Sequence, residues 1–331
     1  MRYVILATTS FGTLFLVGVG GIPLWMGLRF IWRGLSSAGW PTVPGVVLKS
    51  TVSQTEASQK SGTYTLGAYT FYVPELSFGY RVKDRDYTTK NLQFGRAEGS
   101  GDASEAAVLM LRYPVGAKVP VRHHPSDPSL AVVRSGVNSV VVWYLMAGLV
   151  FILFGVVVLL AYIGSEWELF SFSRVMGLMW FIFIFFGVAM LTPGLLSLWR
   201  AKASENWPTV NGTIVFAQEE KTLGAVPDGE GEAIGITTRG VPLAYEYEVN
   251  GEKHFSNVRH FGQFAKSSGN WADQILKRYP AGAQVPVTYC PTDPDLAALE
   301  SGINREAWYL PGGGAAFLLF GLWALYMTLR H

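Results

Sequence analysis

The chain has 331 residues, of which half are hydrophobic and 15% are charged, and its formal net charge is +2 at pH 7. This composition is typical of a membrane protein that carries soluble parts, and the near balance of acidic and basic residues argues against nucleic acid as a partner. The single cysteine, Cys290, excludes a scaffold of intrachain disulfides.

Four apolar runs are each long enough to cross a bilayer, which takes about 20 residues. They occupy residues 4–32, 140–163, 175–199 and 307–329. The first run is too long for the apolar region of a signal peptide and no small-residue cleavage site follows it, so we interpret it as a retained anchor. Small residues at Gly18 to Gly21 and at Gly312 and Ala316 suit close packing, either within the helix set or between copies in a homo-oligomer.

The segments between the apolar runs are two copies of one unit. "GWPTVPGVVLKS" at 39–50 recurs as "NWPTVNGTIVFA" at 206–217, and "LRYPVGAKVPV" recurs as "LKRYPAGAQVPV". We therefore predict two homologous soluble domains, at 39–136 and 206–302, each preceded and followed by a membrane helix. Because the two units run in the same direction, both domains are expected on one side of the membrane.

Within each unit the hydrophobic pattern predicts mainly strands. Apolar and polar residues alternate with period two at 76–82 and 243–249, and Asn250-Gly251 is a strong hairpin signal. The stretches 102–114 and 268–280 each predict one short helix that a proline closes. We therefore predict an α+β membrane protein, in which four transmembrane helices carry two small antiparallel β-barrel or sandwich domains.

Two segments of the predicted domains have few apolar residues. They are residues 53–70 and 218–240, which are rich in Ser, Thr, Gly and Gln. We predict that both are mobile hairpin loops and that any partner specificity resides in them, because loops diverge between copies more readily than strands.

A proline-rich motif closes each unit: "VPVRHHPSDPSLAVVRSG" at 119–136 and "VPVTYCPTDPDLAALESG" at 285–302. In a mechanical interpretation, the first proline ends strand pairing, the aspartate accepts a backbone amide, and the second proline stiffens the exit toward the membrane. The residues with these three roles are Pro125, Asp127 and Pro128 in the first copy and Pro291, Asp293 and Pro294 in the second.

The adjacent histidines His123 and His124 raise the alternative of a metal site. The second copy has Tyr289 and Cys290 at these positions, so the shared element does not need imidazole. Further candidate ligands, which are His254, His260 and Cys290, lie in the other copy. We predict a structural turn, with no metal and no cofactor.

The pairing of "WPTVxG" after a membrane helix with a terminal V-x-Y-x-P-x-x-P resembles the bacterial membrane-anchored family known as domain of unknown function 3592. The second copy matches at Trp207, Pro208, Gly212, Tyr289, Pro291 and Pro294. The first matches at Trp40, Pro41, Gly45, Pro125 and Pro128, while His123 replaces the usual tyrosine. The resemblance covers nearly the whole chain as two tandem copies. The resemblance implies a multi-pass protein of the bacterial cytoplasmic (inner) membrane. It does not suggest any particular activity.

Aromatic residues allow two further interpretations. Trp40 and Trp207 follow basic helix ends, which favours interfacial tryptophans that begin each domain, with a docking surface as the alternative. Alternating aromatic residues at 65–80 favour one buried strand face over an exposed stacking platform.

Basic residues around the apolar runs suggest an orientation. Six flank the helices on the domain side, against three on the other: Arg29, Arg33, Arg134, Arg200, Lys202 and Arg305 against Arg2, Arg174 and Arg330. The positive-inside bias therefore slightly favours cytoplasmic over periplasmic domains.

No motif in the sequence supports catalysis. A Gly-x-Ser-x-Gly elbow, a His-Glu-x-x-His pair and a phosphate loop are all missing. We predict a non-enzymatic membrane protein whose paired β-domains act as an interaction or assembly module for an unknown protein partner. An immunity or protective protein that binds a toxin is one alternative. A small transporter or channel subunit is another, although the charge-free apolar runs argue against it.

Overall fold

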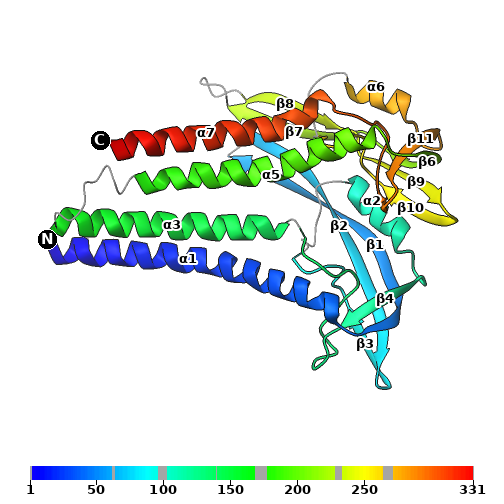
Figure 1. The fold of residues 1–331 in the computed structure, drawn as a ribbon, viewed down its shortest axis with the longest axis horizontal. Helices are drawn as coiled ribbons and strands as arrows, with labels where there is room; N and C mark the ends of the chain where they lie inside the picture. The colour runs from blue at the N-terminus through cyan, green and yellow to red at the C-terminus, as the bar shows by residue number, and fades with distance from the viewer. Residues whose placement is uncertain are drawn as a thin grey trace.

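The computed structural model describes residues 2–61, 64–95, 103–138, 140–167, 177–227, 233–263 and 271–330. Four long helices run side by side, and two β-domains lie together at one end of them (Figure 1). The first and last helices begin and end at the opposite end. The chain is therefore an α+β protein with both domains on the same side of its helices.

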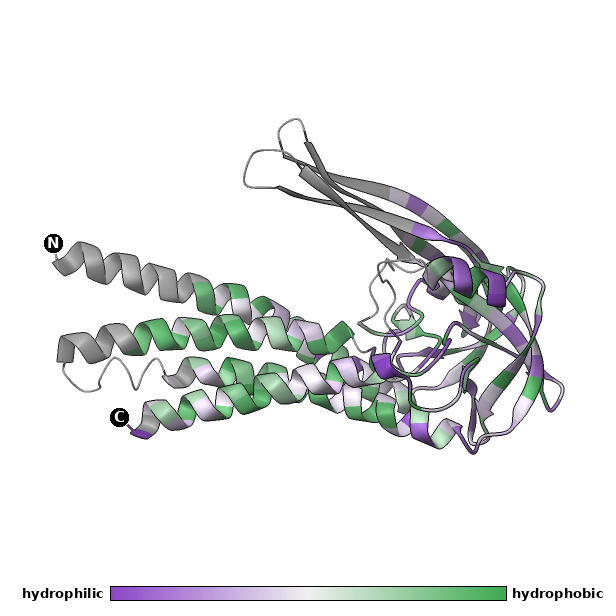
Figure 2. Cartoon of the chain, turned by 90° about the horizontal axis from the view of Figure 1, so that it is seen from above, coloured by the Kyte–Doolittle hydropathy of each residue, from purple (hydrophilic) through white to green (hydrophobic). Residues whose placement is uncertain are grey.

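The long helices are apolar and form two tight pairs. Their bounds are α1 Arg2–Ser36, α3 Val140–Trp167, α5 Trp180–Ser204 and α7 Tyr309–Arg330. Three described segments are long and apolar enough to cross a membrane, namely Val140–Leu160, Trp180–Ser204 and Arg305–Thr328, which indicates a membrane protein. α1 is the fourth candidate span. Figure 2 shows hydrophobic residues along the helices and hydrophilic ones concentrated in the domains.

Glycines allow the paired helices to approach closely, α1 against α3 and α5 against α7. A Cβ atom added at Gly148 would lie 2.7 Å from the carbonyl oxygen of Gly20, and one added at Gly314 would lie 2.9 Å from that of Gly187. Among the residues expected to make such contacts, Gly18, Gly21 and Gly312 have no atom within 4 Å of an added Cβ. Gly20, which lies within the expected stretch, and Gly314, which lies near the expected Gly312, make the contacts because they lie on the helix faces that touch.

Exposed aromatic residues mark both ends of the membrane segment. On the domain side they are Trp32, Trp143, Trp199 and Trp308, and at the far end they are Trp323 and Tyr326. Trp180 and Trp199 are 19 residues apart on α5, which at about 1.5 Å per residue spans about 28 Å. This agrees with a hydrocarbon core of about 30 Å bordered by aromatic belts.

The first domain has five strands of its own and one helix. The bounds are β1 Thr42–Ser61, β2 Tyr64–Val82, β3 Arg85–Thr89, β4 Lys118–His123, β5 Ala131–Val132 and α2 Ala103–Arg112. Their order is β5-β4-β1-β2-β3, and every pairing is antiparallel. The core is formed by apolar residues that alternate along the strands, among them Val47, Phe78 and Val121, and Phe78 lies in the stretch where the sequence predicts this alternation.

The second domain repeats this arrangement. Its elements are β6 Thr209–Ala217, β9 Leu243–Val249, β10 Glu252–Ser256, β11 Gln284–Cys290, β12 Asp293–Ala298 and α6 Trp271–Arg278. The order β10-β9-β6-β11-β12 is equivalent, and β10 also lies against β12, so this sheet nearly closes into a barrel. Asn250 and Gly251 have φ of 52° and 83° and join β9 to β10, so the predicted hairpin is confirmed.

The described parts of the segments predicted as mobile loops, 53–70 and 218–240, are mainly strands, so the prediction of loops is wrong there; residues 62–63 and 228–232 lie outside the described residues. β1 and β2 stay paired up to Ser61 and Tyr64, while β7 Glu220–Pro227 and β8 Ala233–Gly240 form a second hairpin. β7 also pairs with β2 at Gly67 and Ala68, which extends the first sheet to seven strands. Backbone hydrogen bonds between neighbouring strands, which the polar side chains do not reveal, account for the difference.

Three short 3₁₀ helices complete the described chain: η1 Ser37–Gly39, η2 Gly177–Met179 and η3 Arg305–Trp308. η1 and η3 lie between a long helix and a domain, where they carry the chain across the domain-side boundary.

Candidate functional site

The two histidines of the first copy belong to a hydrogen-bonded turn that begins where β4 ends. The ring Nδ1 of His124 accepts hydrogen bonds from the backbone amides of Ser126 and Asp127 at 3.3 and 3.2 Å. Asp127 Oδ1 accepts from the amide and the hydroxyl of Ser129 at 3.1 and 2.6 Å, which holds the pKa of Asp127 below its usual range. His124 and Asp127 are thus both engaged in closing the turn.

The two histidines of the second copy are engaged elsewhere. His254 contacts Asp295, and His260 contacts Arg259 and Glu306. Within the described residues, no group of three or more His, Cys, Asp or Glu side chains is arranged to hold a metal ion.

In the second copy the motif is a hairpin. Cys290, the last residue of β11, pairs with Asp293, the first of β12, and Pro294 lies inside β12. The expectation that the motif leads directly from the last strand to the membrane is wrong, because β12, like β5 in the first copy, first pairs back on the preceding strand. The strand was missed because Pro-x-Asp-Pro normally ends strands, and β12 is at an edge where proline is tolerated.

A tyrosine that the sequence analysis did not single out secures each turn. The hydroxyl of Tyr80 donates to the carbonyl oxygen of Pro128 at 2.5 Å, and that of Tyr247 donates to the carbonyl oxygen of Pro294. Burial raises the pKa of both hydroxyls. The available signal was the recurrence of tyrosine at the same position in both copies.

The tryptophans of the motif pack inside the protein. Trp40 is buried and meets Phe94 and His124 edge-on, with ring centroids 5.8 and 5.1 Å apart. Trp207 meets Phe261 in the same way at 5.6 Å. Both therefore help to attach a domain to its helix pair, and Trp40 offers little surface to a partner, whereas Trp207 is only partly buried.

The residues next to these tryptophans hold the first strand against the fourth. The carbonyl oxygens of Pro41 and Pro208 accept the amides of His123 and Tyr289, each at 3.1 Å. A Cβ atom added at Gly45 would lie 2.5 Å from Val121 Cγ2, and one added at Gly212 would lie 2.6 Å from Val287 Cγ2. Only glycine fits this close approach.

The two domains are joined by an ion pair at the end of α2. Arg112 Nη1 and Nη2 lie 3.0 and 3.1 Å from the carboxylate oxygens of Asp295 on β12, and Nη2 also donates to the carbonyl oxygen of Phe255 at 3.0 Å. His254 Nδ1 lies 2.9 Å from the same carboxylate. The side chains of Arg112 and Asp295 are 20% and 41% exposed, so the contact is partly shielded from water.

This junction depends on residues that differ between the copies. In the first domain, Tyr87 and Ser129 occupy the positions of His254 and Asp295. Arg278, the counterpart of Arg112, instead pairs with Glu300 inside its own domain at 3.1 Å. The docking is therefore one-way, with α2 of the first domain on the sheet of the second.

The outer sheet face of the first domain is apolar and hollowed. Val46 and Leu48 are 40% and 52% exposed, and beside Gly79 they border a groove of about 380 Å³. The face also carries the ion pair between Arg81 and Asp86.

The same face of the second domain is more polar, although Val215 stands where the first domain has Leu48. Glu246 stands where the first domain has Gly79, and it pairs with Lys253 at 3.3 Å. Thr213 replaces Val46 and accepts a hydrogen bond from Gln284 at 2.8 Å. The two copies thus share a fold and differ in what they present to the outside.

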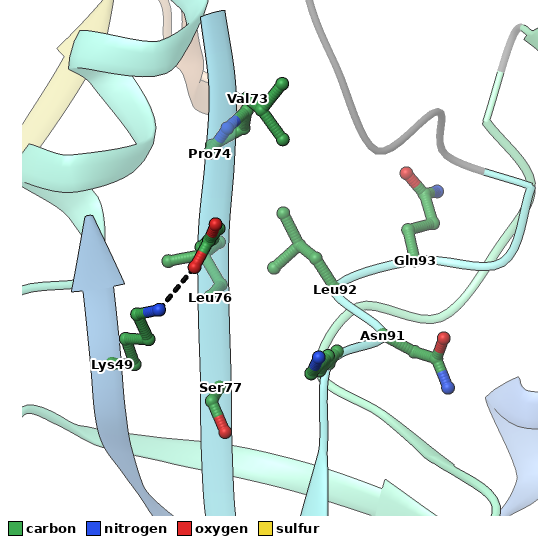
Figure 3. Close-up of a pocket in the computed structure, with 10 residues that line it drawn as sticks. Lys49, Val73, Pro74, Leu76, Ser77, Asn91, Leu92 and Gln93 are labelled. Carbon is green, nitrogen blue, oxygen red and sulfur yellow. Dashed lines mark hydrogen bonds and ion pairs between the residues drawn. The ribbon is translucent and has the colours of Figure 1, made fainter. Parts of the chain in front are cut away.

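A second cavity of about 380 Å³ lies between β2 and the segment that follows β3 (Figure 3). Its charged lining residues are Lys49, Glu75 and Lys90, and Lys49 pairs with Glu75. The hydrogen bond from Lys49 and the charges of both lysines lower the pKa of Glu75. The rest of the lining combines amide side chains with apolar ones: Val73, Pro74, Leu76, Ser77, Asn91, Leu92 and Gln93.

Comparison with known families identifies the family to which the two domains belong. The model of the family described as Domain of unknown function (DUF3592) matches residues 43–138 and 210–304, which is more than half of the chain. No curated protein and no solved structure gives a significant match. The chain belongs to this family and carries its domain twice in tandem.

Proposed function

We propose that this tandem DUF3592 protein is a non-enzymatic membrane module in which the first domain binds an apolar segment of a protein partner and the second domain supports it. The observation that carries the proposal is the difference between the outer sheet faces. Strand order and core are the same in both copies, whereas the exposed apolar groove at Val46, Leu48 and Gly79 is particular to the first.

The physical argument is the cost of leaving this groove in water. Burial of apolar surface is favourable by roughly 25 cal/mol per Å². Charged residues beside the groove can in addition fix the orientation of the bound segment. The Arg81–Asp86 pair lies at its edge, where it would contribute a polar rim. Strands and an ion-paired junction hold the groove in place, so little ordering is needed on binding.

Site-specific photo-crosslinking in native membranes tests this function. A photoreactive residue at Val46 should give a protein adduct, whereas the same residue at Thr213, the matched position of the second domain, should not. Gly79→Glu introduces the residue that the second copy has, and its Cβ would meet only the tip of Leu48, at 3.0 Å. This change should abolish the adduct without unfolding the protein. An adduct that persists in Gly79→Glu, or equal adducts at both positions, would contradict the proposal.

We further propose that the domains face the cytoplasm of a bacterial cell, on the basis of the basic residues at the domain side of the helices. Cys290 is the only cysteine and is partly exposed, so it can report orientation without a cysteine-free background. A membrane-impermeant maleimide should label inside-out vesicles and spare right-side-out ones, with Cys290→Ser as the blank. The reverse pattern would place the domains in the periplasm.

A further inference from the structure

The cavity of the first domain begins at the level of the membrane surface. Trp32 marks the domain-side aromatic belt, and two residues later the carbonyl oxygen of Gly34 accepts the amide of Gly136 at 3.1 Å. A Cβ atom added at Gly136 would lie 3.6 Å from Nε2 of Gln93, which lines the cavity. The rim of the cavity therefore lies within a few Å of the belt.

The lining segment is fixed to the start of a membrane helix. Phe94 forms a bridge with Val137, three residues before α3 begins, and the carbonyl oxygen of Leu92 accepts the amide of Arg134 at 2.8 Å. From Gln93 to Lys90 is three residues, which span at most about 10 Å. The headgroup layer adds about 5–8 Å to each side of the hydrocarbon core, so a lysine side chain can reach it from this height.

The chemistry of the lining is that of an amphiphile site. The lining includes two ammonium groups, on Lys49 and Lys90, and one carboxylate, that of Glu75, so the charged side chains of the cavity carry a net positive charge. Among the described residues, no ion pair to Lys90 is formed, and it remains able to bind an anion. Leu76 and Leu92 supply an apolar wall beside these charges. A ligand with a phosphate group attached to an apolar part matches both the positive charge and the apolar wall of the cavity.

The charged groups are not required by the fold. In the second copy, Phe216 stands in the place of Lys49, Pro242 in that of Glu75, and Asn257 in that of Lys90, yet the strand order is the same. Their presence in the first copy therefore calls for a role other than folding.

We propose that this cavity binds the phosphate headgroup of an anionic membrane phospholipid, with Lys49 and Lys90 as the groups that contact the phosphate. The lipid would enter from the adjacent leaflet, and its chains would stay among the membrane helices. This site is separate from the outer groove of the first domain, so the two proposals can fail independently.

Native mass spectrometry of the full-length protein in detergent tests the lipid site. Added phosphatidylglycerol should bind saturably, and the variant Lys49→Gln/Lys90→Asn should bind it more weakly by about fivefold per lysine. Lys118→Gln is the matched control, because it removes a charge from the outer face and installs the second copy's Gln284. This control should bind as the wild type does.

Three results would overturn the proposal. The double variant could retain full affinity, phosphatidylcholine could bind as tightly as phosphatidylglycerol, or inorganic phosphate could displace the lipid at equal concentration. The last result would identify a site for a soluble anion. Thermal unfolding of each variant shows that it is folded, since neither lysine is buried.

Discussion

Arg112 of the first domain and Asp295 of the second form a two-pronged ion pair, with N–O distances of 3.0 and 3.1 Å across 183 positions of the sequence. Bidentate guanidinium–carboxylate contacts fix orientation as well as distance. This pair therefore helps to set how α2 of one repeat lies on the sheet of the other, together with the hydrogen bond from Asn257 to Ser104 on α2.

We expect Arg112→Ala to lower the free energy of unfolding by about 1–3 kcal/mol, because it leaves the carbonyl of Phe255 without its donor and leaves Asp295 with His254 as its remaining partner. Arg81→Ala, which removes the exposed pair with Asp86, should cost under about 1 kcal/mol. Thermal unfolding in detergent, followed by tryptophan fluorescence, measures both. Equal losses would mean that the junction stabilises the protein no more than an exposed ion pair does.

Gly45→Ala and Gly212→Ala should each destabilise the protein by about 1–3 kcal/mol through overpacking against Val121 and Val287. Gly39→Ala is the control, since an added Cβ there has no atom within 4 Å. The same melting experiment applies. A neutral Gly45→Ala would show that β1 and β4 can separate without cost, contrary to their close approach.

His260 makes stability depend on pH. It is 1% exposed, and burial together with the neighbouring Arg259 lowers its pKa below the usual value, while Glu306 opposes the shift. A histidine with a lowered folded-state pKa binds fewer protons when folded, so its contribution is complete above the unfolded pKa of about 6.5 and is lost as pH falls below it.

The first copy supplies the test of this histidine, because Gln93 occupies the equivalent position. The melting temperature of the wild type should fall between pH 7.5 and pH 5, at about 2–4 °C for each kcal/mol lost. His260→Gln should flatten that dependence. If both proteins show the same slope, titration of other groups governs it.

Much of the fold was predictable because local patterns and the repeat agree. Period-two alternation located the core strands, and apolar length located the helices. The hairpins β1–β2 and β7–β8 were missed because backbone pairing holds them, and their polar sequences resemble loops. The junction at Arg112 was missed because its acceptors, Asp295 and the carbonyl oxygen of Phe255, are long-range contacts, and the first copy does not repeat Asp295 or the neighbouring His254.

The candidate sites were less accessible to sequence reasoning than the fold. The turn motif stood out because prolines and aspartate recur, whereas the groove at Val46 and the cavity at Lys90 lie where the copies differ. Positions at which the two repeats agree indicate residues that the fold needs. Positions at which they differ indicate candidate binding surfaces. The strand pairing must be known before one can tell which of these differing positions lie on the same face of the sheet.

The pairing of β7 with β2 has a consequence for chains that carry the domain once. An unpaired strand edge invites pairing with another chain. In the tandem protein, the second repeat covers that edge within the same molecule, at the high effective concentration that a covalent link provides. A single-repeat chain with the same long hairpin would have to obtain the missing strand from a second molecule, so duplication turns an assembly that depends on concentration into one that does not.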